Sequence, residues 1–234
     1  MSGLESRNNP SSWHQLLDLA LPIVDEGLGV ESKQWTLGGG TAIALRLSHR
    51  ISDDVDIFVP GIPLKNFVPS NNDAARRLVK GGNNFQWPGH YVKFELPEGE
   101  IDFLSAALET NPGFDWEEFR GRKIALETCE EVIIKKLRYR GGQLTERDAF
   151  DIAAVARSDA SLADAIANYA ADALPRLKVS LEVLAKRPPD TVANKVRPME
   201  GYEDLTKTAI SDCLEIIARA QEIVDECTNF HIPK

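Results

Sequence analysis

The chain has 234 residues, of which 43% are hydrophobic and 27% are charged, and its formal net charge is −9 at pH 7. This balance is typical of a globular protein with one large or two small domains and excludes a largely disordered chain. Residues 1–120 carry 17 acidic and 10 basic side chains, whereas residues 121–234 carry 19 and 17. A chain with this charge is not a general coat for nucleic acid, so any phosphate binding requires a local site.

Neither a membrane anchor nor a secretory segment is expected. The longest apolar stretch near the N-terminus, residues 16–24, is interrupted by Asp18 and Pro22 and is too short to cross a bilayer. It also lacks the basic flank and the small-residue cleavage site of a secretory signal. Cys129, Cys213 and Cys227 have neither metal-ligand spacing nor even pairing, which predicts reduced thiols in a cytoplasmic protein.

Hydrophobic periodicity predicts a mixed α/β half followed by an all-helical half. In the first half we expect helices over residues 13–26, 41–48 and 73–80, and strands over residues 34–37, 54–59, 91–96, 100–106 and 123–126. Residues 97–99 have hairpin composition. In the second half we expect helices near residues 129–140, 145–157, 161–173, 175–186 and 203–228. We therefore predict an α+β protein with an α/β domain at 1–127 and a helical domain at 128–234.

Three glycines, residues 38–40, end a predicted strand and precede Thr41 and a predicted helix. Because glycine lacks a Cβ, an anion can approach the backbone closely, and the helix N-terminus directs N–H groups and a positive dipole end toward it. Thr41 can add a hydroxyl group. The turn alone is weak evidence, because it lacks the spacing of a dinucleotide fingerprint and the lysine of a P-loop.

Asp54 and Asp56 follow on a predicted strand, where they share one face, roughly 7 Å apart at Cα, while Val55 and Ile57 face the core. Two carboxylates so placed repel each other unless a cation or a proton relieves them. Their oxygens suit Mg²⁺, whose coordination is completed by water and substrate phosphates. A glycine turn, a helix and an acidic strand in this order together predict a nucleoside triphosphate site.

A third carboxylate would complete a metal site, and Asp102 is the candidate. It lies on the predicted strand 100–106, where Ile101 and Phe103 are expected to face inward. Glu100 shares the face of Asp102, but Asp102 is more central in the strand. Considered alone, both carboxylates are better interpreted as the solvated face of an edge strand.

A second group of charged residues lies on two predicted helices. Lys136 and Arg140 are four residues apart and share a face, as do Asp148 and Asp151, which are three apart, and Thr145 caps the second helix. Lys136 and Arg140 could bind triphosphate oxygens, and Asp148 could pair with Lys136 or orient or deprotonate an attacking hydroxyl. An interhelical salt-bridge network explains the pattern equally well.

His49 lies between the predicted helix 41–48 and the acidic strand. Its position invites a catalytic role. We expect it instead to cap the C-terminus of the helix, where a cation is favoured.

Two motifs resemble those of a known family, the AbiEii-like nucleotidyltransferases, which are toxin components of abortive-infection, type IV toxin–antitoxin systems. The first motif resembles the opening signature of the family and consists of residues 39–42, 45–47 and 49–58. The second resembles a lysine–leucine helix followed by an Arg-Asp-aromatic-Asp stretch and consists of Lys136, Leu137, Arg140, Arg147, Asp148 and residues 150–152. The resemblance spans roughly residues 35–155.

The resemblance implies a polymerase-β-like nucleotidyltransferase core with a helical C-terminal domain. It also implies Mg²⁺-dependent transfer from an NTP, and a cognate antitoxin as partner. Some relatives act on tRNA 3′ ends, so a tRNA is a candidate acceptor. By the match, the expected metal ligands are Asp54, Asp56 and Asp102. The expected nucleotide contacts are Gly39, Gly40, Thr41, Lys136 and Arg140, and the expected catalytic residues are the three aspartates with Lys136 and Asp148.

The mechanism that fits these roles is phosphoryl transfer assisted by two metal ions. Asp54 and Asp56 would hold Mg²⁺ against the triphosphate, and Asp102 with Asp54 would hold the ion that lowers the pKa of the attacking hydroxyl. Lys136 and Arg140 would neutralise charge on the leaving pyrophosphate. Two alternatives remain: a catalytically inert binding module of the same fold, and a nucleotidyltransferase that is no toxin and modifies a small molecule or a protein.

Overall fold

The computed structural model describes residues 3–29, 34–79 and 84–230. The chain divides into two compact units, which are Met1–Leu45 with Ser52–Thr128, and Arg46–Ile51 with Cys129–Lys234. The short segment Arg46–Ile51 therefore interrupts the first unit in sequence and packs with the second. The division into an α/β domain at 1–127 and a helical domain at 128–234 stays a prediction.

Among the described residues, seven strands of the first unit form a mixed sheet in the order β3-β4-β5-β2-β1-β7-β6. The strands are β1 (Thr36–Gly38), β2 (Val55–Phe58), β3 (Phe85–Gln86), β4 (Tyr91–Leu96), β5 (Gly99–Leu104), β6 (Phe114–Phe119) and β7 (Arg122–Glu127). β1 pairs antiparallel with β2 and parallel with β7, and β2 pairs parallel with β5. The other neighbours pair antiparallel, including the predicted hairpin of β4 and β5.

The sequence did not predict β3 and β6, which form the two edges of the sheet. In β6, Phe114 and Trp116 alternate with acidic residues, and Trp116 is 56% exposed. An edge strand in which only the last apolar residue, Phe119, is fully buried lacks the alternating buried pattern by which strands are recognised. The five predicted strands are confirmed as β1, β2, β4, β5 and β7, with small shifts of their ends.

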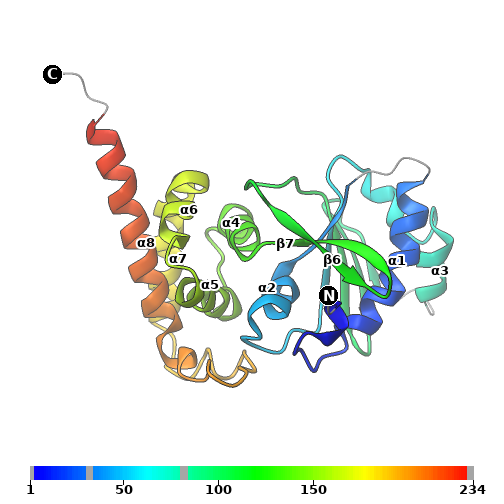
Figure 1. Ribbon diagram of the computed structural model, residues 1–234, viewed down its shortest axis with the longest axis horizontal. Helices are drawn as coiled ribbons and strands as arrows, with labels where there is room; N and C mark the ends of the chain where they lie inside the picture. The colour runs from blue at the N-terminus through cyan, green and yellow to red at the C-terminus, as the bar shows by residue number, and fades with distance from the viewer. Residues whose placement is uncertain (1–2, 30–33, 80–83, 231–234) are drawn as a thin grey trace. The chain divides into compact units, whose positions relative to one another are not determined.

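One face of the sheet packs against helices of the same unit. Ile57 of β2 and Phe103 of β5 are fully buried, and helix α1 (Trp13–Leu28) contacts both strands. The short helix α3 (Asp73–Leu78) packs beside α1 (Figure 1). Because side chains alternate along a strand, the acidic residues that flank these apolar ones point to the opposite face. That face carries the candidate site.

The remaining elements of the first unit are short. They are the 3₁₀ turns η1 (Leu4–Ser6) and η2 (Leu64–Phe67) and the helix α2 (Gly39–Leu47), whose last two residues belong to the second unit. Helix α2 begins two residues before its predicted start, directly at the glycine turn.

The second unit is helical, as predicted. Its helices are α4 (Cys129–Arg140), α5 (Glu146–Ser158), α6 (Leu162–Tyr169), the 3₁₀ turn η3 (Ala171–Ala173), α7 (Leu174–Ala185) and α8 (Leu205–Phe230). The long helix α8 packs against α5, α6 and α7 (Figure 1). Helix α5 begins with a capping box, in which Thr145 Oγ1 accepts a hydrogen bond from the Asp148 N–H, and the Asp148 carboxylate accepts one from the Thr145 N–H.

The structure also bears on the membrane and cysteine predictions. Across residues 3–29, 34–79 and 84–230, no helix is both long enough and apolar enough to cross a membrane. Cys129, Cys213 and Cys227 form no disulfide within the described residues, and their redox state and the compartment stay a prediction.

Candidate functional site

The glycine turn joins β1 to α2 and packs directly against the acidic strand. Gly38 pairs with Asp56 in the β1–β2 ladder, and Gly39 has a φ of +66°. A Cβ at Gly39 would lie 1.7 Å from Asp56 Oδ2. Position 39 therefore requires glycine for two reasons: the left-handed backbone and the close approach of the Asp56 carboxylate.

The Thr41 hydroxyl fastens the turn to the chain that leads into the acidic strand. Thr41 is buried, and its Oγ1 donates to the Asp54 carbonyl oxygen and lies 3.0 Å from Ser52 Oγ. The Ser52 carbonyl oxygen in turn accepts hydrogen bonds from Ser11 Oγ and Asn9 Nδ2. These bonds give Thr41 a positioning role, and its contact with a phosphate stays a prediction.

Asp56 and Asp102 are direct neighbours across the parallel pair of β2 and β5. Adjacent strands are about 4.8 Å apart, so Asp102 lies nearer to Asp56 at Cα than Asp54 does. On the other side of β5, Lys93 of β4 is the partner of Asp102 in the antiparallel β4–β5 ladder. Its Nζ lies 3.3 Å from Asp102 Oδ2. Asp102 Oδ1 is buried and has no hydrogen-bond partner within the described part of the chain.

This environment raises the pKa of Asp102 to about 7. Burial is the largest cause, and the negative charge of Asp56 adds to it, against the opposing effect of Lys93. Both causes penalise the ionised carboxyl group, and a cation bound beside Asp56 would relieve both. The adjacent carboxylates of Asp56 and Asp102 fit a divalent metal ion, as does the buried Asp102 Oδ1, which lacks a partner among the described residues.

The other two carboxylates of this face are engaged in hydrogen bonds. Asp54 directly precedes β2, and its Oδ1 accepts from the Glu100 N–H at 3.2 Å. The Glu100 carboxylate accepts from Lys93 Nζ. Among the described residues, no group of three or more His, Cys, Asp and Glu side chains is arranged to hold a metal ion. Asp56 and Asp102 are thus already adjacent, whereas Asp54 would have to turn away from Glu100 to join them.

Lys93 is a polar member of this face that the sequence reasoning missed. The hairpin turn at residues 97–99 contained the necessary information, since it sets the register that pairs Lys93 with Asp102.

In the second unit, Lys136, Arg140, Asp148 and Asp151 form a lysine–aspartate cluster. Lys136 is 8% exposed, and its Nζ lies 2.7 Å from Asp148 Oδ1 and 3.0 Å from Asp151 Oδ2. Arg140 Nη1 donates to Asp148 Oδ1 at 3.1 Å. The interhelical network that the sequence left open therefore exists, and it joins α4 to α5.

The cluster keeps both Lys136 and Asp148 charged. Burial alone would lower the pKa of Lys136, but Asp148 and Asp151 outweigh it, so this pKa is raised. Burial would raise the pKa of Asp148, but Lys136 and Arg140 together lower it to about 2. A carboxylate this acidic is a poor proton acceptor at neutral pH, so the geometry favours Asp148 as the partner of Lys136 over Asp148 as a general base.

His49 and Arg50 contact the lysine–aspartate cluster, because their segment packs in the second unit. His49 Nε2 lies 2.8 Å and Arg50 Nε 2.6 Å from Asp151 Oδ1. His49 is fully buried, and burial lowers its pKa against the effect of Asp151, so the ring is neutral at pH 7 and donates through Nε2–H. The expected cationic helix cap is therefore wrong. Asp151 lies 102 residues further along the chain, and no local pattern links the two.

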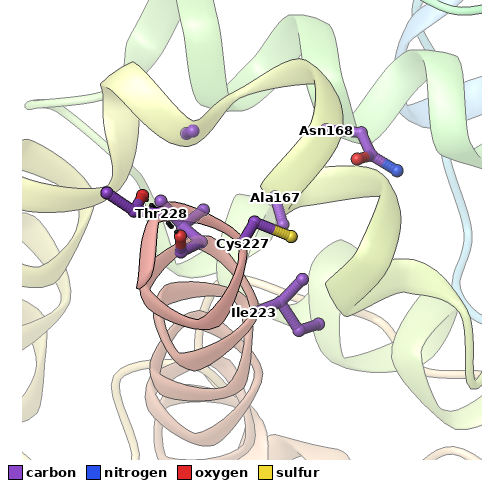
Figure 2. A pocket seen from close by; sticks show the side chains of 7 residues that line it. Ala167, Asn168, Ile223, Cys227 and Thr228 are labelled. Carbon is purple, nitrogen blue, oxygen red and sulfur yellow. Dashed lines mark hydrogen bonds between the residues drawn. The ribbon is translucent and has the colours of Figure 1, made fainter. Parts of the chain in front are cut away.

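A cavity of about 590 Å³ lies elsewhere in the second unit, between α6 and the end of α8 (Figure 2). Its lining residues are Ala167, Asn168, Ala171, Ile223, Val224, Cys227 and Thr228. None of them belongs to the predicted site.

Residues 26–215 of the chain match the sequence profile of a family described as nucleotidyl transferase AbiEii toxin, Type IV TA (toxin–antitoxin) system. Because the match covers most of the chain, the protein belongs to this family. It is a nucleotidyltransferase. No protein with a curated description matches the chain.

Several solved structures are similar to this one. ANT(2″)-Ia, in complex with adenylyl-2″-tobramycin, has a TM-score of 0.50 and 17% identity over 69% of this chain and 99% of its own. A protein from H. pylori described as a nucleotidyltransferase has a TM-score of 0.44 and 17% identity, over 92% and 96% of the two chains. MenT4, a nucleotidyltransferase toxin from Mycobacterium tuberculosis H37Rv, has a TM-score of 0.48 and 14% identity over 93% and 92%. The family match and the likeness to ANT(2″)-Ia confirm the predicted nucleotidyltransferase fold, and the helices of the second unit confirm the helical C-terminal part.

Proposed function

We propose that the protein transfers a nucleotide from an NTP to the 3′ end of a tRNA in a Mg²⁺-dependent reaction. Family membership supports the transfer of a nucleotide. The metal dependence is supported by the buried Asp102 Oδ1 beside Asp56, which has no hydrogen-bond partner among the described residues. A cognate antitoxin is the partner expected from the type IV family.

The first unit supplies the metal ligands and the phosphate turn. Asp56, Asp102 and, after turning, Asp54 would hold Mg²⁺. When bound, the ions would neutralise phosphate charge and lower the pKa of the attacking hydroxyl. Gly39 and Gly40 present backbone N–H groups at the start of α2 to phosphate oxygens.

Lys136 and Arg140 are proposed to bind triphosphate oxygens and to neutralise the leaving pyrophosphate. Their match to the second family motif supports this role, as does the raised pKa that keeps Lys136 charged. Asp148 holds Lys136 in place through the 2.7 Å hydrogen bond.

The test is incubation of the protein with Mg²⁺, total tRNA and each of the four labelled NTPs in turn. We expect wild type to label tRNA with a preferred nucleotide, EDTA to abolish labelling, and D56N to reduce the rate by at least about 100-fold. E118Q is the matched control, since Glu118 is an exposed acidic residue of β6 in the same sheet, and it should behave as wild type. Equal rates for wild type and D56N would contradict the proposed metal site. Transfer to a small molecule or a protein, with no labelled RNA, would contradict the acceptor.

A further inference from the structure

Asp151 of α5 is a fully buried carboxylate that is bound from several directions. Its Oδ1 contacts Arg50 Nε at 2.6 Å and His49 Nε2 at 2.8 Å. Its Oδ2 contacts Lys136 Nζ at 3.0 Å and Arg50 Nη2 at 3.1 Å. Both oxygens are thus occupied by the protein itself, so any influence of Asp151 on the reaction acts through a neighbour.

That neighbour is Lys136. An ammonium group has three N–H donors, so its contacts with Asp148 and Asp151 leave capacity for an oxygen of a bound anion. A free lysine side chain populates many rotamers and loses this freedom when it binds a ligand. An ammonium that two carboxylates already hold has lost most of it before the ligand arrives.

Arg50 and His49 hold Asp151 in place, and backbone hydrogen bonds anchor their own segment. Ile51 N–H donates to the Arg197 carbonyl oxygen, Met199 N–H donates to the His49 carbonyl oxygen, and Arg50 pairs with Pro198 in an isolated β-bridge. The planar Arg50 guanidinium therefore reaches Asp151 from a fixed backbone and binds both oxygens in a fork.

We propose that Asp151 is a positioning residue for nucleotide transfer, which, held by Arg50 and His49, fixes the Lys136 ammonium beside Asp148 for binding the triphosphate. The inference rests on the proposed role of Lys136 as a phosphate-binding residue. Without Asp151, the ammonium would keep only Asp148, whose Oδ1 it shares with Arg140.

The test must separate positioning from a contribution to folding. Removal of Asp151 alone would leave the Arg50 guanidinium buried without its carboxylate, which is strongly destabilising. The double variant R50Q/D151N removes the charge pair together. The matched control is R157Q/D204N, which removes an ion pair between Arg157 of α5 and Asp204, the residue before α8, whose side chains are 38% and 65% exposed.

The measurements are binding of inorganic pyrophosphate by titration calorimetry, kcat and KM for the NTP, and thermal unfolding. We expect R50Q/D151N to unfold cooperatively, to bind pyrophosphate about tenfold more weakly and to raise KM by a similar factor, while kcat changes less. The control should match wild type, D151E should recover part of the affinity, and K136M should lose pyrophosphate binding.

Three results would overturn the inference. Wild-type affinity and KM in R50Q/D151N, with K136M impaired, would refute the positioning role and leave the proposed function intact. Wild-type binding by K136M would refute the proposed role of Lys136 and this inference with it, while the D56N and EDTA tests of the proposed function would still stand. Failure of both R50Q/D151N and D151E to fold would assign Asp151 to the fold alone.

Discussion

Replacement of Gly39 by alanine tests the central geometry of the candidate site. The backbone at this position is left-handed, with a φ of +66°. The added Cβ would lie 1.7 Å from Asp56 Oδ2, 2.5 Å from its Cγ and 2.8 Å from its Cβ. Because even the Asp56 Cβ is too close, rotation of the carboxylate alone cannot relieve the clash, and Asp56 itself must move.

Gly61 provides a matched control. Its φ is +68°, almost equal to that of Gly39, but nothing lies within 4 Å of its added Cβ. G61A should therefore show only the backbone cost of alanine in the left-handed region, about 1–2 kcal/mol. G39A should show the same cost plus about 1–3 kcal/mol for the displaced strand. Displacement of Asp56 by about 1 Å should also reduce transfer by about 100-fold.

The assay compares the two variants by urea unfolding, followed by circular dichroism, and by nucleotide transfer at saturating Mg²⁺. The informative quantity is the difference in free energy of unfolding between G39A and G61A, because the backbone cost of alanine is common to both variants. If both variants lost equal stability and both kept wild-type transfer, the contact between the turn and Asp56 would have no functional meaning.

Two further predictions concern pH and have opposite signs. Because the folded-state pKa of Asp102 is about 7 against a usual value of 3.8, wild type without divalent metal loses stability as the pH rises through 7. The free energy of unfolding of D102N should therefore exceed that of wild type by about 1 kcal/mol or more at pH 8 in EDTA, and by less at pH 5. A difference in urea unfolding that does not change with pH would refute this. Because the pKa of His49 is lowered from 6.5 by burial, wild type should lose stability as the pH falls through 6.5. H49Q should flatten the profile between pH 7 and pH 5, and an unchanged slope would show that another group causes it.

Much of the candidate site was visible in the sequence because its parts are local. The alternation of Asp54 and Asp56 with Val55 and Ile57 requires only the two-residue period of a strand, and the structure shows those apolar residues fully buried. The pairing of Lys136 with Asp148 was one of two open interpretations, since helical spacing defines which residues share a face but not what that face contacts. The cationic cap predicted for His49 failed because the partner of its side chain, Asp151, lies 102 residues further along the chain.

The sequence by itself determined the helices of both units, five of the seven described strands, and the order in which the glycine turn, the acidic strand and the lysine helix follow. Those features depend on spacings of two to four residues, which the backbone geometry imposes directly. Only the tertiary structure decided that β2 lies parallel to β5, that Asp102 therefore adjoins Asp56, and that Arg50 binds Asp151. These contacts join residues 46 and 101 positions apart, and they depend on strand order and on packing of the whole core, which no local period encodes.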